Sequence, residues 1–231
     1  MSEVAGEVAR VRARIAAAAG RAGRRPEEII LVAVTKGVEL ARIREVVTAG
    51  VTDVGESRVQ EAVAKIAALR ATARWHLVGH LQRNKAGLAA GLFSVIHSLD
   101  SIRLAEDLSR RAPQPLDVLL QVNVAREPQK FGLTPESLAA VLRSTAQLPR
   151  LRVIGLMTIA PLHPDPEHAR PVFRSLRTFR DEVARVLGTA LPHLSMGMSD
   201  DFEVAIEEGA TLVRVGRAIF TPAARNPQEM S

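Results

Sequence analysis

A lysine at the end of a strongly apolar segment is the first residue whose position suggests chemistry. In "IILVAVTKGVEL" (29–40), Lys36 lies where a charged side chain is least easily accommodated, and the chain has only four lysines among its 31 basic residues. An uncharged lysine amine can attack an aldehyde and form a Schiff base. Lys36 is therefore a candidate for binding a carbonyl compound, and a lysine that ends a strand with its amine in water is the simpler interpretation.

Two segments in the last quarter of the chain, "LSMGMSDD" and "VRVGRAIF", carry residues suited to a phosphate. Ser195, Gly197 and Ser199 offer hydroxyl groups and close backbone approach just before a predicted helix, and Gly216 opens a second, short helix in the same way. The N-terminus of a helix favours anions. Taken singly, Ser199 would be a helix cap and the glycines would be turns. Two such segments together predict a phosphate site.

The elements that must position these residues follow from the hydrophobic pattern. Short apolar segments that alternate with amphipathic ones predict strands at 29–35, 51–55, 75–79, 94–99, 116–124, 152–158, 192–197 and 211–216. Helical patterns lie near 40–49, 57–70, 82–90, 101–111, 134–147, 168–188 and 199–208. Eight strands alternating with helices predict a parallel sheet that closes into a single (β/α)8 TIM barrel. The alternative, an open doubly wound sheet, usually shows a glycine-rich fingerprint that this chain lacks.

Length and composition support one domain. No Pro/Gly-rich linker divides residues 1–231, and the segment 2–21 has apolar residues at three- and four-residue intervals, which predicts an extra N-terminal helix rather than a signal peptide. No apolar run approaches the roughly 18 residues needed to cross a membrane. We therefore expect a soluble, cytoplasmic protein. The absence of cysteine excludes disulfides and thiolate chemistry.

The barrel prediction brings the candidate residues to one place. Active sites of such barrels lie at the C-terminal ends of the strands, and phosphate groups bind the loops after strands seven and eight. Because closure makes the eighth strand a neighbour of the first, Lys36, Arg214 and the Gly216 turn are expected at one rim. These groups together suggest pyridoxal phosphate, because the lysine can react with its aldehyde, the loops can bind its phosphate and the arginine can contact its ring nitrogen.

The same residues lie in motifs that resemble a known family. The segments "VAVTK", "VGESRVQEA", "WHLVGHLQRNK", "QVNVAREPQKFGL" and "LSMGMSDDFEVAIEEGATLVRVGRAIF" resemble the YggS/PROSC family of pyridoxal-phosphate-binding homeostasis proteins, over about residues 5–222. The resemblance implies a fold-type-III barrel like the N-terminal domain of alanine racemase. It also implies a role in intracellular vitamin B6 and amino-acid homeostasis, without robust catalysis. Its implied partners are apo-enzymes that receive the cofactor, and its implied state is a monomer or weak dimer.

The resemblance also implies roles for individual residues. Lys36 resembles the Schiff-base lysine, and Arg214 resembles the partner of the pyridine nitrogen. Ser195 and the Gly216 turn resemble the phosphate cradle, to which Ser199 is expected to contribute.

Four positions depart from the family pattern. Ser57 and Arg58 stand where the family usually has asparagine and tyrosine, and Val38 replaces a lysine that often follows the Schiff-base lysine. Arg217 replaces a threonine after the glycine of the eighth-strand motif. The loss of that hydroxyl removes one expected phosphate contact, although the Arg217 backbone N–H remains and a guanidinium binds phosphate itself. We include Ser57 and Arg217 in the expected cofactor site.

Other candidates leave alternatives open. His76 either lines the pocket or is a hydrogen-bonded core histidine, and Lys130 follows the fifth strand, where it would guide or transiently accept the cofactor. His163, Asp165 and His168 lie in a proline-rich segment that predicts a loop rather than a metal site.

Two other function classes remain beside the homeostasis protein. An amino-acid racemase is the main alternative, but the related enzyme uses a tyrosine from a second domain, and this chain has no tyrosine. Nucleic-acid binding rests only on the net charge of +6, and the chain has only six phenylalanines and one tryptophan to stack on bases.

Overall fold

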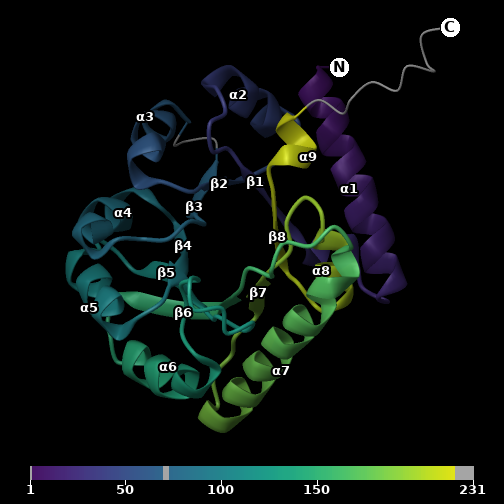
Figure 1. Cartoon of the computed structure of the whole chain (residues 1–231). Coiled ribbons are helices and arrows are strands. Elements are labelled where there is room, and N and C mark those ends of the chain that lie inside the picture. The colour runs from purple at the N-terminus through teal and green to yellow at the C-terminus, as the bar shows by residue number, and fades with distance from the viewer. Residues whose placement is uncertain (1, 70–72, 222–231) are drawn as a thin grey trace, which may run out of the picture.

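A closed barrel of eight parallel strands is the centre of the molecule (Figure 1), in the computed structural model that describes residues 2–69 and 73–221. The strands follow one another around the barrel in chain order, and β8 pairs with β1. Their bounds are β1 Ile30–Val34, β2 Asp53–Glu56, β3 Arg74–Leu77, β4 Val95–Leu99, β5 Leu116–Gln121, β6 Leu151–Met157, β7 His193–Ser195 and β8 Leu212–Val215. The structure confirms the TIM barrel and rules out the open sheet.

Helices cover the outside of the barrel. They are α1 Glu3–Arg21, α2 Leu40–Thr48, α3 Val59–Leu69, α4 Ala86–Leu92, α5 Ile102–Arg111, α6 Leu138–Ala146, α7 Arg170–Leu187, α8 Phe202–Glu207 and α9 Arg217–Phe220. Short 3-10 turns are η1 Pro26–Glu28, η2 Arg83–Lys85, η3 Pro135–Ser137 and η4 Pro166–Ala169. Among the described residues we find no helix with the length and apolarity that a membrane span requires.

The extra helix α1 covers the side of the barrel where its first and last elements meet. Helix α9, which follows β8, has only four residues and is too short to cover this region alone. Figure 1 shows α1 running alongside α8 and α9. An apolar stripe of α1 is buried there, and Arg14 and Arg21 form ion pairs with Glu203 and Glu207 of α8. The predicted N-terminal helix therefore replaces much of the missing eighth outer helix.

The side chains of β1 alternate between the inside and the outside of the barrel, as a strand requires. Ile30, Val32 and Val34 pack in the inner apolar cluster, whereas Leu31 and Ala33 pack against the outer helices. Inner-cluster residues of the other strands and their ends are Val78, Val95, Leu119, Met157 and Leu212. Two residues beyond Val34, the same alternation brings Lys36 to the mouth of the barrel.

Candidate functional site at the barrel rim

Lys36 lies at the C-terminal end of β1 and is held by the residue before it. Thr35 is buried, its N–H bonds to the carbonyl of Gly55, and its hydroxyl donates to Oε1 of Glu56 at 2.6 Å. Lys65 donates to the same Glu56 oxygen at 2.6 Å and to the Thr35 carbonyl at 2.7 Å. This buried cluster fixes the backbone from which Lys36 extends. The Lys36 side chain itself is exposed, so the burial expected from the sequence is absent.

Lys36 shares a cavity with the eighth-strand turn. The cavity has a volume of about 380 Å³, and Lys36, Gly216 and Arg217 line it together with Arg42 and Phe220. Lys36 and the turn residues Gly216 and Arg217 are thus brought together, as the sequence predicts. The Arg217 guanidinium forms an ion pair with Asp200 at the surface.

Arg214 is a buried cation inside the barrel, at the level of Val32 on β1. Only 5% of its surface is exposed, and burial lowers its pKa to about 10. Its Nη1 donates to Oγ of Ser195 at 2.6 Å, and its Nη2 donates to the Thr158 carbonyl at 2.9 Å. Both acceptors are neutral groups, so the guanidinium carries a charge that no hydrogen-bonded carboxylate neutralises among the described residues.

Ser195 lies inside the barrel, where its hydroxyl oxygen accepts a hydrogen bond from Arg214. Its side chain has no exposed surface, and its hydroxyl lies 2.8 Å from Nδ1 of His97. His97 in turn contacts His76, which contacts Asp53. The sequence-based expectation placed the Ser195 hydroxyl in a phosphate cradle, whereas in the structure both of its neighbours are buried side chains. His76 is the hydrogen-bonded core histidine of the two alternatives.

The loops after β7 and β8 present unpaired backbone donors. Among the described residues, the N–H groups of Ser199, Gly216 and Arg217 have no hydrogen-bond acceptor. The Ser199 hydroxyl accepts a bond from the Ala218 N–H at 3.3 Å, which ties the two loops together. Unpaired N–H groups are costly when they are withdrawn from water, so a cluster of them suits an anion.

Gly197 is required for packing between β7 and α8. Its φ is +88°, and a Cβ atom there would lie 2.5 Å from Cβ of Ala205. Asp201, the residue immediately before α8, accepts a bond from the Met198 N–H instead of capping the helix with its side chain. Burial raises the pKa of Asp201.

The remaining candidates lie apart from this cavity. Ser57 follows β2, and its backbone carbonyl packs against Gly79, where a Cβ atom would come within 2.2 Å. Lys130 forms an ion pair with Glu127 at 2.5 Å and lines a different cavity of about 150 Å³, after β5. His163 and His168 stack on each other in the loop before α7.

Comparisons with known proteins find relatives that match nearly the whole chain. The family model "Alanine racemase, N-terminal domain" matches residues 7–223. A pyridoxal phosphate homeostasis protein of Aquifex aeolicus (strain VF5) is 46% identical over 217 residues, which is 92% of this chain and 95% of that protein. The structure of PipY from Synechococcus elongatus PCC7942 with PLP bound superposes with a TM-score of 0.82 and 38% identity, over 94% of this chain and 99% of PipY.

A more distant likeness concerns the fold alone. Alanine racemase from Corynebacterium glutamicum has a TM-score of 0.75 and 14% identity, and the match covers 96% of this chain but 61% of the racemase. The barrel of this chain therefore corresponds to part of the racemase.

Proposed function

The chain belongs to the alanine racemase N-terminal domain family and, within it, to the pyridoxal phosphate homeostasis proteins, and on this premise we propose that it binds pyridoxal 5'-phosphate at the barrel rim. Its role would be to keep the intracellular pools of vitamin B6 and amino acids in balance, without robust catalysis. The observation that carries the proposal is the shared cavity of Lys36 and the Gly216–Arg217 turn, which follows the buried cation Arg214 by two residues.

The residues present fit this cofactor at each of its polar groups. The unpaired N–H groups of Ser199, Gly216 and Arg217 suit the phosphate, and the Arg217 guanidinium would have to leave its ion pair with Asp200 to add a positive charge there. The Lys36 amine is the group that would hold the aldehyde carbon covalently. Arg214, whose hydrogen bonds use one N–H on each of two nitrogens, has further N–H groups for the ring nitrogen. Ser195 is assigned to holding Arg214 rather than to the phosphate.

The surroundings argue against efficient racemisation. Bound pyridoxal phosphate supplies an aldehyde that condenses with amines and a ring that withdraws electrons most strongly when its nitrogen is protonated. Arg214 would donate to that nitrogen and, with a pKa of about 10, keeps its own proton at neutral pH. A two-base racemase also needs a second proton carrier, and this chain has neither tyrosine nor cysteine. Lys130 is paired with Glu127 in another cavity.

The exposure of Lys36 supports a carrier role. A cofactor held at an open rim is accessible to other molecules, and we propose that cytoplasmic apo-enzymes receive it from a monomer or weak dimer of this protein.

Covalent mapping tests the proposal. The protein is reconstituted with pyridoxal phosphate and reduced with borohydride, and its peptides are mapped by mass spectrometry. We expect the adduct on Lys36, and the matched Lys36→Met variant should lose it while Lys85→Met keeps it. An adduct on Lys65, Lys85 or Lys130 alone, or none at all, contradicts the proposed site.

Deuterium exchange tests the racemase alternative. Alanine is incubated in deuterated water with the reconstituted protein, and we expect no useful turnover. Scrambling of the stereocentre with α-deuterium uptake at several turnovers per second, abolished in Lys36→Ala, would establish an enzyme instead.

A further inference from the structure

A continuous chain of five hydrogen-bonded side chains crosses the inside of the barrel. Arg214 of β8 contacts Ser195 of β7, and Ser195 lies 2.8 Å from Nδ1 of His97 on β4. Nε2 of His97 lies 2.8 Å from Nδ1 of His76 on β3, and Nε2 of His76 lies 2.9 Å from Oδ1 of Asp53 on β2. Each of the five side chains is buried.

The hydrogen bonds of this chain have one consistent direction. The ionised Asp53 carboxylate can only accept, so His76 donates to it from Nε2. When both imidazoles are neutral, Nδ1 of His76 then accepts from Nε2 of His97, and Nδ1 of His97 accepts the proton of Ser195. The Ser195 oxygen in turn accepts from Arg214, which can only donate. Burial lowers the pKa of both histidines, and for His97 well below its usual range, which keeps them neutral.

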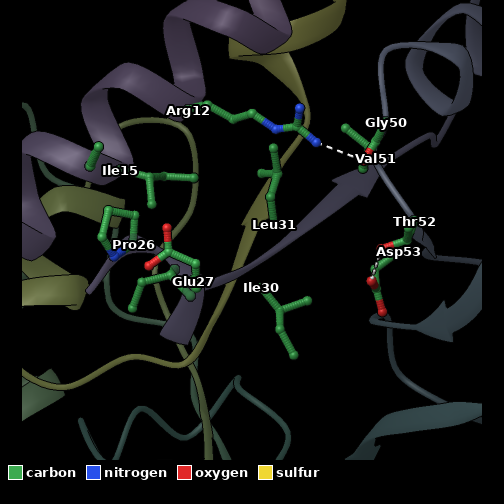
Figure 2. A pocket seen from close by; sticks show the side chains of 12 residues that line it. Arg12, Ile15, Pro26, Glu27, Ile30, Leu31, Gly50, Val51, Thr52 and Asp53 are labelled. Atoms are coloured by element: carbon green, nitrogen blue, oxygen red, sulfur yellow. Dashed lines mark hydrogen bonds between the residues drawn. The ribbon is translucent and has the colours of Figure 1, made fainter. Parts of the chain in front are cut away.

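The chain ends in opposite charges, and Val32 of β1 pairs in register with Asp53 on one side and with Arg214 on the other. Its acidic end, Asp53, begins β2 and borders a cavity of about 620 Å³ between α1 and the starts of β1 and β2. Figure 2 shows Thr52 and Asp53 together at the edge of this cavity, and the Thr52 hydroxyl donates to Oδ2 of Asp53 at 2.7 Å. Burial alone would raise the pKa of Asp53, but the hydrogen bonds from His76 and Thr52 outweigh it and the pKa is lowered. The carboxylate therefore stays ionised and accepts from His76.

The interior of such a barrel is usually apolar, so a chain of five buried polar side chains needs a physical explanation. Val, Ile and Leu dominate most TIM-barrel interiors, and polar groups buried there cost free energy even when they are paired. The basic end of the chain is Arg214, whose guanidinium has no hydrogen-bonded carboxylate among the described residues, although the charge of Asp201 acts on it at longer range. Orientation must therefore come from the neutral groups that accept its protons, Ser195 and Thr158.

We propose that His97 is a positioning residue for the cofactor's ring nitrogen, acting through Ser195 and Arg214. By accepting the Ser195 proton, His97 turns a lone pair of the hydroxyl toward Arg214, which fixes the plane of the guanidinium. His76 and Asp53 keep His97 in the tautomer that can accept. This inference rests on the proposed function, because it takes the ring nitrogen to be the partner of Arg214.

The first experiment needs no cofactor. In the apoprotein, side-chain nitrogen NMR should show His97 and His76 protonated at Nε2, with the Nδ1 resonance of His97 shifted by its hydrogen bond. Ser195→Ala should move that resonance and leave His193 unchanged. His193 is the matched control, because it also belongs to β7 but bonds to Thr211 outside the chain. A His97 protonated at Nδ1 would overturn the proposal.

The second experiment measures the cofactor. Because a hydrogen bond to a charged group is lost or misdirected, His97→Leu and Ser195→Ala should each weaken pyridoxal phosphate binding about tenfold. The double variant should bind no more weakly than the weaker single variant, since both changes interrupt one chain. His97→Gln, whose amide can accept from Ser195 and donate to His76, should restore part of the affinity. The midpoint pH at which the absorbance of the bound ring changes should shift in His97→Leu and should not shift in His193→Leu.

The outcomes separate the two proposals. Multiplied effects in the double variant, or an equal effect of His193→Leu, would show general damage to the barrel and refute the positioning role. If His97→Leu does not fold, the affinities of Ser195→Ala and His97→Gln for pyridoxal phosphate decide between a positioning role and general damage to the barrel. Failure of the parent protein to bind pyridoxal phosphate would refute the proposed function and with it the role for the ring, while the nitrogen NMR would still show whether the chain exists.

Discussion

Acid should destabilise the apoprotein through the two buried histidines. In an unfolded chain a histidine has a pKa near 6.5. In the folded barrel, burial lowers the pKa of His97 well below that value and lowers that of His76, against the opposing effect of Asp53. As the pH falls below about 6.5, the unfolded state binds protons that the folded state refuses, so stability is lost. The loss stops once the pH passes the folded-state pKa.

The magnitude follows from the number of protons. One proton taken up only by the unfolded state costs up to about 1.4 kcal/mol per pH unit. Between pH 7.5 and 5.5, His97 should therefore remove about 1.4 kcal/mol from the free energy of unfolding, and His76 should remove up to the same amount again. The carboxylate of Asp53, with its lowered pKa, adds a loss only below about pH 4.

Urea unfolding at the two pH values measures this loss. The chain has one tryptophan, Trp75, which is buried on the outer side of β3 and reports on the barrel by fluorescence. The free energy of unfolding of His97→Gln should fall by about 1.4 kcal/mol less than that of the parent protein over the same pH interval, because glutamine binds no proton in the unfolded state. Groups common to both proteins cancel in this comparison. Equal losses in the two proteins would refute the reasoning, and would mean that His97 is protonated in the folded barrel or never buried.

Three further predictions concern other parts of the chain. Lys65→Met should cost about 3 to 5 kcal/mol in chemical unfolding because it leaves the Glu56 carboxylate buried and unpaired, and adding Glu56→Gln should recover much of that loss. Gly197→Ala should cost about 1 to 2 kcal/mol for its left-handed backbone and about 1 to 3 kcal/mol for overlap with Ala205, whereas Gly188→Ala, with open space around it, should show only the first cost in a thermal melt. Any nucleic-acid binding should be non-specific and should collapse between low and physiological salt in a filter-binding titration, and selective binding that survives physiological salt would contradict this.

The alternation of apolar segments was sufficient to predict the barrel, whereas Arg214, expected at the rim with Lys36, lies buried beside Val32. Strand order in a TIM barrel follows the chain, so finding eight strands also fixed which loops are neighbours. That is why Lys36 and the Gly216–Arg217 turn could be placed together from the sequence, although some 180 residues separate them. Element ends were less predictable. The fifth strand stops at Gln121 rather than at 124, because the Asn123 amide bonds to the carbonyls of Glu127 and Lys130 and turns the chain.

The interior chain could not be predicted in the same way. Alternation indicates that Ser195 points inward, but it does not say how deep in the barrel the hydroxyl lies or what it meets there. His97 and Ser195 come from strands on different sides of the barrel, and their contact depends on strand tilt and side-chain rotamers. A usable signal was nevertheless present, since His76 and His97 are polar residues in otherwise apolar strands, and such residues need partners when they are buried.

The position of α1 has a consequence for the order of events during synthesis. Its apolar stripe leaves the ribosome first, yet its partners on α8 lie about 190 residues later in the chain. At a translation rate of about 5 to 20 residues per second, α1 would wait roughly 10 to 40 seconds for them. During that time the buried stripe of α1 has neither α8 nor α9 to pack against. The nascent barrel therefore stays open along one side until its last strand and the helices beside it arrive.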